Sequence, residues 1–363
     1  MKFIGSLVAV LALVLLAYLG VGLGGHESVP VDQDSFSMYT VFGVVLPYLA
    51  IVVLLIGIVW RVLRWAKCPV PFRIPTTCGQ QKSLPWIKHS KLDNPFTKWQ
   101  VVGRMALEVL FFRSLFRNTR MDYRADEAKV VYGPTKWLWV AGLAFHYSFL
   151  VIFFRHVRFF TEPVPWVVKL AQDVDGFFQV GVPVFYITSA VLLAAAGYLL
   201  VRRLFIPQVR YISLINDYFP LLLILGIGST GFLLRHLVKT DIVAIKELGI
   251  GLLAFNPQPP TGVHWLFYAH LLMVCALFIY FPFSKLMHMA GVFLSPARNM
   301  ANNNRAVRHI NPWNPKVHVH TYAEYEDDFR EKMIAAGIPV DKTVEQAAAE
   351  AAAGESKAAG DKE

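Results

Sequence analysis

The sequence predicts an all-α fold, an integral membrane helical bundle with about six transmembrane helices. The first observation is composition: 55% of the 363 residues are apolar, only 17% are charged, and the mean hydropathy is +0.45. Ordinary soluble domains carry more charge than this. The second observation is a set of long apolar runs, and the third is the placement of basic residues beside the ends of those runs. These three features point to a membrane protein.

Six apolar stretches are long enough to cross the hydrocarbon core of a bilayer, which takes about 20 residues of helix. They are residues 4–24, 40–63, 137–156, 180–201, 217–236 and 264–287. The first stretch has the position of a signal peptide, but its apolar run is long and no clear Ala-x-Ala cleavage site follows it. We therefore expect an uncleaved anchor and a multi-pass protein.

Basic residues fill alternate loops and predict the orientation of the bundle. They follow the second helix (Arg61, Arg64, Lys67, Arg73), precede the third (Arg120, Arg124, Lys129, Lys136) and follow the fourth (Arg202, Arg203, Arg210). Because cytoplasmic loops carry the excess of Lys and Arg, we expect both termini on the cytoplasmic side of the cytoplasmic (inner) membrane. The formal charge of +10 does not indicate a nucleic-acid partner, since no recognition motif accompanies these bases.

Four regions are predicted along the chain. Residues 1–64 form two transmembrane helices, 65–136 a basic cytoplasmic loop, 137–290 a bundle of four helices, and 291–363 a cytoplasmic tail that is expected to be disordered towards its end. Within the loop, apolar and basic residues interleave over 96–118, as is typical of a helix lying in the membrane interface. A soluble helix that docks a partner fits the same pattern.

The three cysteines give little functional information. Cys68, Cys78 and Cys275 form neither a CxxC pair nor a CxxCH motif for haem attachment. Neither a covalent haem nor a self-contained iron–sulfur cluster is therefore indicated. Cys68 and Cys78 lie in the cytoplasmic loop, where reduced thiols are the default, and their spacing matches no metal motif.

Four histidines in the predicted membrane helices carry the functional signal, because polar side chains are costly inside a bilayer. His146 and His156 lie ten residues apart on the third helix, and His270 and His288 lie eighteen apart on the sixth. An interval of eighteen is five whole helical turns, so His270 and His288 should share one face about 27 Å apart. His146 and His156 should lie about 15 Å apart and differ in direction by about 80°.

The third and sixth helices are expected to run antiparallel, with His156 opposite His270 near the outside and His146 opposite His288 near the cytoplasm. Each pair could then ligate one haem iron axially, which would give the bundle a dihaem core. The two rises differ by about 12 Å, so tilt, side-chain reach and a bend at Pro282 must absorb the difference. The alternative is that these histidines are interfacial or bond a neighbouring helix.

The remaining histidines suggest less. His236 and His264 lie at the outer ends of the fifth and sixth helices, where a different pairing could use them, although such residues are more often interfacial. His309, His318 and His320 lie beyond the membrane, and no further ligands stand near them at a recognisable metal-binding spacing.

Paired histidines at these two intervals resemble the nitrate reductase gamma-subunit family of membrane cytochromes b, over roughly residues 137–290. The resemblance implies two haem b groups. His146 and His288 would ligate the cytoplasmic-side iron, and His156 and His270 the outer-side iron. The two preceding helices, the loop segments PFRIPTTCG and SLPWIK and the polar tail are similar to the DsrM family, the membrane cytochromes of the Dsr complexes of sulfur metabolism.

The second resemblance implies a subunit that exchanges electrons between menaquinone or menaquinol and a cytoplasmic iron–sulfur partner like DsrK, in dissimilatory sulfur metabolism such as sulfate respiration. Quinol oxidation near the outer haem is our working hypothesis, and the sequence does not exclude the reverse direction. Five basic residues near the outer helix ends could pair haem propionates or hold a quinone oxygen, and interfacial anchoring explains them equally well: Arg155, Arg158, Lys169, Arg235 and Lys239.

Other functions compete with this one. The chain could be the gamma-type cytochrome b of another respiratory complex, with a nitrate or heterodisulfide reductase, or a haem-free anchor or transporter. Transporters tend to show inverted repeats and broken helices, and neither is evident here, although Pro220 and Pro282 could interrupt helices. No catalytic side chain is required of the protein, because the redox chemistry would belong to the cofactors.

Overall fold

The computed structural model describes residues 2–23, 37–68, 81–82, 84–177, 183–304, 306–308 and 319–349. Within these ranges, six helical segments are long and apolar enough to span a membrane: Lys2–Gly22, Met38–Ala66, Lys136–Phe159, Ile187–Phe205, Ile215–Val238 and Trp265–Phe283. The predicted all-α membrane fold is therefore confirmed. The chain divides into two compact units, residues 1–310 and 311–363, and all six segments belong to the first.

The helices of the first unit follow one another in the order α1 (Lys2–Ala17), α2 (Met38–Thr40), α3 (Leu46–Ala66), α4 (Lys98–Phe111), α5 (Arg113–Phe116), α6 (Lys136–His156), α7 (Trp166–Asp175), α8 (Ile187–Phe205), α9 (Pro207–Ile212), α10 (Ile215–Leu233), α11 (Ile242–Leu253), α12 (Trp265–Tyr280), α13 (His288–Gly291) and α14 (Pro296–Asn299). Turns of π-helix continue α1 and α10 and precede α3, at Tyr18–Gly22, Leu234–Val238 and Val41–Val45. Turns of 3₁₀-helix follow α6 at Val157–Phe159, follow α12 at Phe281–Phe283 and Lys285–Met287, and follow α13 at Val292–Leu294.

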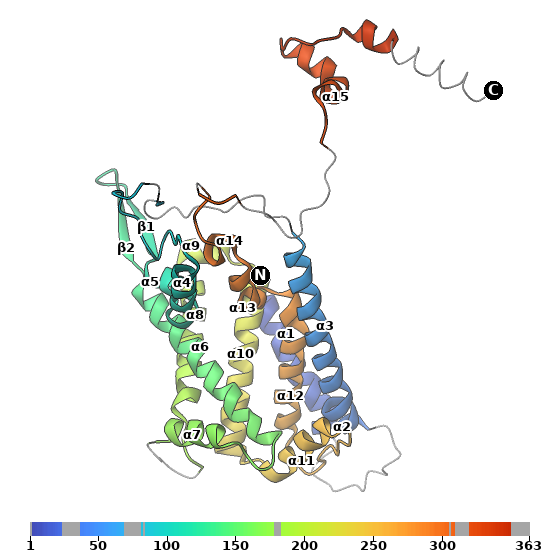
Figure 1. Ribbon diagram of the computed structural model, residues 1–363. Coiled ribbons are helices and arrows are strands. Elements are labelled where there is room, and N and C mark those ends of the chain that lie inside the picture. Colours follow the sequence, from blue (N-terminus) through green and yellow to red (C-terminus); the bar gives the residue numbers. More distant parts are fainter. Residues whose placement is uncertain are drawn as a thin grey trace, which may run out of the picture. The chain divides into compact units, whose positions relative to one another are not determined.

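The long helices lie side by side, with α7 and α11 at one end of the bundle and α4, α5 and α9 at the other (Figure 1). We call residues 84–134 the platform. It contains α4, α5 and an antiparallel hairpin of β1 (Thr119–Arg124) and β2 (Lys129–Pro134), in which Thr119 pairs with Pro134. The hairpin was not predicted, although alternating side chains in TRMDYR and KVVYGP on either side of a short polar turn were a readable signal.

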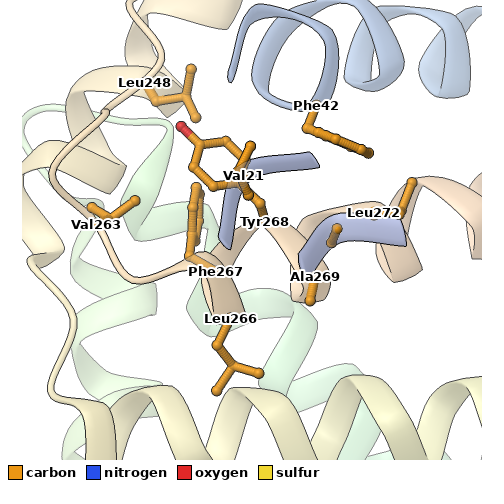
Figure 2. Close-up of a cluster of buried hydrophobic side chains, with 10 residues drawn as sticks. Val21, Phe42, Leu248, Val263, Leu266, Phe267, Tyr268, Ala269 and Leu272 are labelled. Carbon is orange, nitrogen blue, oxygen red and sulfur yellow. The ribbon is translucent and has the colours of Figure 1, made fainter. Parts of the chain in front are cut away.

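The apolar core lies around α12, the most buried of the six spans. One cluster joins α12 to the end of α1 and the start of the second span, where Tyr268 and Phe267 pack near Val21 and Phe42 (Figure 2). Ala17, Ala50 and Ala269 are completely buried. Small residues at such contacts let helix backbones approach closely, which is how helices associate in lipid. A second cluster joins α12 to α10 and α1.

Polar contacts tie α1 to the start of α10. The Lys2 ammonium donates to the Ser213 carbonyl at 3.0 Å, and the Ser6 hydroxyl lies 3.3 Å from the Ile215 carbonyl. Ser6 is fully buried in this contact. The first apolar stretch is therefore built into the bundle, while its retention as an uncleaved anchor stays a prediction.

Two predicted helices are interrupted. The sixth was expected to be continuous to residue 287, but α12 ends at Tyr280, and Ser284 adopts an extended conformation with φ −110° and ψ 178°. Pro282 lacks the amide hydrogen that would continue the helix, so the predicted bend is present and the five uninterrupted turns are not. The segment 96–118 breaks at Phe112, which adopts left-handed φ and ψ of 49° between α4 and α5.

Two further boundaries differ from the prediction. The fourth span begins at Ile187 rather than at residue 180, because an extended residue, Tyr186, precedes the helix. In the second unit, α15 (Tyr322–Ala335) begins with a capping box between Thr321 and Glu324. Residues 344–349 are also helical, and residues 350–363, where disorder was expected towards the end of the tail, lie outside the described residues.

Candidate functional site

The structure brings the four membrane histidines together in two pairs. His146 lies on α6 and His288 begins α13, and their ring centroids are 6.0 Å apart with the planes at 86°. Two imidazoles that bind one metal from opposite sides have ring centres about 6 Å apart, since each metal–nitrogen bond is about 2 Å. We call His146 and His288 the platform pair, because they lie toward the platform end of the bundle.

His156 on α6 and His270 on α12 form the distal pair, toward the end that carries α7 and α11. They lie close enough to interact electrostatically. After α12 the chain passes through two 3₁₀ turns and the extended residue Ser284 before it reaches His288, so no continuous α-helix joins His270 to His288.

Three of the four rings are oriented by main-chain carbonyls. The Nδ1 atom lies 2.7 Å from the Gly142 carbonyl in His146, 2.7 Å from the Ile152 carbonyl in His156, and 2.9 Å from the Lys285 carbonyl in His288. A carbonyl oxygen only accepts hydrogen bonds, so Nδ1 must carry the hydrogen. The lone pair of each neutral ring is then on Nε2, which is available to bind a metal.

In His270, Nδ1 also carries the hydrogen, but its partner is a side chain of another helix. Its Nδ1 lies 3.0 Å from the Thr230 hydroxyl on α10, and that hydroxyl donates to the Gly226 carbonyl at 2.8 Å. Since the hydroxyl hydrogen is already used, Nδ1 donates to Thr230, and Nε2 keeps its lone pair. A Cβ atom added at the neighbouring Gly231 would lie 3.3 Å from Cε1 of the ring, so α10 packs directly on this imidazole.

His264 has the opposite arrangement. Its Nδ1 accepts a hydrogen bond of 3.2 Å from the Leu266 amide as the N-cap of α12, so the neutral ring carries its hydrogen on Nε2. His236 packs against Phe232 and Phe185 instead. His320 lies in the second unit, 3.7 Å from Asp328, and His309 and His318 lie outside the described residues.

The platform reaches the platform pair through Phe112. Its ring meets the His146 ring edge-on at 4.9 Å, and Phe145 does the same at 5.1 Å. A left-handed backbone is unusual for a bulky residue and persists only where the surroundings fix it. Ala269 packs in the α12 core with no exposed surface.

A buried ion pair adjoins the distal pair. Arg155 Nε lies 2.9 Å from Asp175 Oδ2, with 8% and 5% of the two residues exposed. The Thr188 amide and hydroxyl donate to the same carboxylate at 2.8 and 2.6 Å. A buried charge needs partners of this kind, so the Arg155 charge is engaged in joining α6, α7 and α8.

Of the other basic residues predicted near the outer helix ends, some pack against the protein and some are exposed. Arg235 donates to the Val184 carbonyl at 3.0 and 3.1 Å and lies over the Tyr186 ring. Arg158 lies over the ring of Phe159. Lys169 on α7 and Lys239 after α10 expose their side chains at the distal end of the bundle. Thr230 and Gly231, which contact the His270 ring, were not predicted from the sequence. A run of small residues within an apolar helix, GIGSTG, was the available signal.

Residues 96–309 match the family described as nitrate reductase gamma subunit. The chain belongs to this family. The gamma-subunit match contains the platform helices, α6, α8, α10, α12 and all four paired histidines, and it extends beyond the predicted 137–290 at both ends. The family resemblance that the histidine spacing suggested is therefore confirmed.

Relatives within and around the gamma-subunit family carry more specific names. The chain is 44% identical over 282 residues to the Hdr-like menaquinol oxidoreductase cytochrome b-like subunit of Archaeoglobus fulgidus, covering 76% of this chain and 84% of that protein. The protein of the same name in Archaeoglobus profundus is 40% identical over 277 residues, or 74% and 82% of the two chains. The respiratory nitrate reductase 1 gamma chain of Escherichia coli is 32% identical over 113 residues, 29% of this chain and 50% of that one.

Proposed function

We propose that the chain is a membrane dihaem cytochrome b that exchanges electrons between menaquinone or menaquinol and a cytoplasmic iron–sulfur partner of the DsrK type, as the DsrM family does in dissimilatory sulfur metabolism. One observation carries the proposal: all four paired imidazoles bond through Nδ1 and offer Nε2. The names of the two Archaeoglobus relatives, which contain both menaquinol oxidoreductase and Hdr-like, support the quinone and the iron–sulfur partner.

The residues present fit two haem groups. His146 and His288 would hold one iron, and His156 and His270 the other. Each bound haem would supply an iron that takes up and gives back one electron. The protein supplies neutral imidazoles whose hydrogen-bonded Nδ1 atoms fix the ring orientation and strengthen Nε2 as a donor. Phe112 and Phe145 meet the His146 ring edge-on and help to fix its orientation.

We place the platform and both termini on the cytoplasmic side, because the basic loops lie there. Quinol would then be oxidised near the distal pair, with protons leaving outward and electrons passing to the partner near the platform. Arg158, Lys169 and Lys239 remain our candidates for a quinone oxygen or haem propionates. Arg155 and Arg235 already engage Asp175 and the Val184 carbonyl, so their role would be to hold the helices beside His156.

The visible spectrum of the purified full-length chain tests this proposal. Two bis-histidine haems b are expected, and His146→Ala and His270→Ala should each remove about half of the haem absorbance. His264→Asn is the matched control, because asparagine keeps the N-cap of α12 while removing a ring that offers no Nε2 lone pair. A colourless wild-type chain from haem-replete cells would contradict the proposal, as would equal loss of haem from the His264 variant.

Purification of the native complex tests the partner. An iron–sulfur subunit resembling heterodisulfide reductase is expected to co-purify with the chain. A molybdenum enzyme in its place would assign the chain to a nitrate reductase, which the similarity to the gamma chain of Escherichia coli makes the second candidate. This outcome would leave the haem assignment intact and overturn only the choice of partner.

A further inference from the structure

Helix α4 is amphipathic in the reverse sense to a helix on a soluble protein. Its buried residues are Val101, Arg104 and Glu108, whereas Trp99 is 84% exposed and Val102 is 55% exposed. At about 100° per residue, the buried positions lie on one side of the helix, and the exposed apolar positions 99, 102, 106 and 110 lie on the other. A helix on a water-facing surface would place its charges outward.

Both inward charged residues have hydrogen-bond partners within the protein. Arg104 donates to the Asp93 carbonyl at 3.2 Å, and both oxygens of Glu108 accept from Ser114, at 3.1 Å from its amide and 2.5 Å from its hydroxyl. The segment 296–299, which forms α14, also packs on α4. The polar side of α4 is therefore committed to the protein, and only the apolar side remains to meet the surroundings.

Two hydrogen bonds place the end of α4 alongside a membrane span. The Trp139 indole donates to the Phe111 carbonyl and the Tyr147 hydroxyl donates to the Leu110 carbonyl, both at 2.8 Å. Trp139 and Tyr147 lie about 5 and 17 Å along α6 from its first residue, Lys136, at about 1.5 Å per residue. The carbonyl end of α4 thus lies beside the membrane-spanning part of α6 rather than beyond it.

We propose that the exposed side of α4, formed by Trp99, Val102, Ala106 and Leu110, is embedded in the lipid bilayer and continues the lipid-facing surface of α6. The same end of the bundle carries features of a membrane interface. Trp137 at the start of α6 is 77% exposed, and the Lys136 ammonium lies 3.3 Å from the centroid of the exposed Phe116 ring. Lys98 stands at the start of α4, where its ammonium can reach the lipid headgroups.

A bilayer accounts for this surface better than a protein partner does. The four outward residues are all apolar, and the surface continues into α6, a span that is long and apolar enough to lie in lipid. Positions 99, 102 and 106 also occupy the part of α4 farther from Phe112, so this surface is separate from the ring that touches His146. The proposal does not depend on haem binding.

Spin labels can test the proposal on the full-length chain in vesicles of phosphatidylethanolamine and phosphatidylglycerol. A nitroxide is attached to Val102→Cys or Ala106→Cys, in a chain with Cys68→Ser, Cys78→Ser and Cys275→Ala. Its collision rates with oxygen, which concentrates in lipid, and with a water-soluble nickel chelate are then measured. Ile56→Cys on the exposed side of α3 is the lipid reference, and Tyr123→Cys in the hairpin is the water reference.

The expected oxygen-to-nickel ratio at positions 102 and 106 matches that at 56 and exceeds that at 123 by about tenfold. A ratio equal to that at 123 would show a water-facing helix and overturn the proposal. Low collision rates with both reagents, in the chain alone or in its complex, would show a surface covered by protein and overturn it equally. Haem absorbance is measured on the same samples, so that failure of the lipid-embedding proposal can be distinguished from failure of the dihaem assignment.

Discussion

The platform pair and the distal pair present the same nitrogen but are held differently. In the platform pair, both Nδ1 atoms bond to carbonyls three or four residues earlier in the same segment, at Gly142 and Lys285. In the distal pair, His156 follows this local rule, but His270 bonds to α10, through the Thr230 hydroxyl and the Ile227 backbone. The platform pair is therefore oriented by its own backbone, and the distal pair by the packing of two helices.

This difference indicates which structural change would disturb the orientation of each pair. Movement of α10 relative to α12 would disturb His270 and leave the platform pair unchanged. A disturbance of the platform would act through Phe112 on His146 and leave His270 unchanged. Side-chain substitutions can therefore be chosen that affect one pair at a time.

The largest effect is expected from Gly231→Val. A Cβ atom there would already lie 3.3 Å from His270, and the two further methyl groups of valine must displace the ring. We expect loss of about one of the two haems, with the platform haem retained. Gly197→Val on α8 is the control, because nothing lies within 4 Å of a Cβ at that helical position. Full haem content in the Gly231 variant would show that α10 does not confine the ring.

A smaller effect is expected from Thr230→Val, which keeps the shape of the side chain and removes its hydroxyl acceptor for the His270 Nδ1 hydrogen, leaving the Ile227 backbone bond. Loss of such a partner typically weakens metal binding by roughly 10–100-fold. Haem retention during dilution, followed by absorbance, measures the change. Thr161→Val removes a hydroxyl that bonds to the Val157 carbonyl of its own helical turn, and it should leave both haems in place. Equal haem loss from the two variants would refute the role of Thr230.

Removing the Phe112 ring should weaken the packing of His146 by about 1 kcal/mol, since an edge-on aromatic contact contributes about 0.5–1.5 kcal/mol. Greater access of water favours the oxidised, more charged iron, so the platform midpoint potential should also fall. Phe112→Gly and Phe112→Ala should shift the potential equally, but only alanine adds backbone strain at φ 49°. Phe116→Ala, which does not touch His146, is the control for a redox titration.

The smallest effect is expected from Asp93→Asn, which acts on the platform alone. Burial opposes ionisation of this carboxyl, but hydrogen bonds from Arg113 and Ser90 and the charges of Arg113 and Arg117 lower its pKa from 3.8 to about 2. Its contribution to stability is therefore full above pH 3.8 and is lost as the pH falls through 2. Hydrogen exchange in α5 should be faster in the variant at neutral pH, and the difference should vanish near pH 2.

Much of the bundle could be predicted, and the four membrane histidines could be selected as candidates, because span length and the cost of a polar group in lipid act on single segments. The bend near Ser284 was predicted from Pro282, but the extended conformation of Ser284 and the start of the next helical turn at Lys285 were not. The left-handed Phe112 has no local signal at all. Its conformation follows from contacts with α6, which periodicity along one helix cannot reveal.

The site also shows what a single sequence hides about charge. Arg155, Arg158, Lys169, Arg235 and Lys239 look alike as basic residues near helix ends. The fold gives Arg155 a buried carboxylate, Asp175, from a short helix that was not predicted, and gives Arg235 a carbonyl 51 residues away. Long-range partners of this kind depend on how connecting segments fold back, and apolar patterning says little about those segments.

Three of the four imidazoles bond to main-chain oxygens, and this has an evolutionary consequence. Every amino acid carries a main-chain carbonyl oxygen, so no point mutation can delete this acceptor. Sequence variation therefore cannot easily change the hydrogen bonding of those three rings. Thr230 supplies a side-chain acceptor to the fourth ring, so a change in its codon could adjust one of the two proposed haem sites.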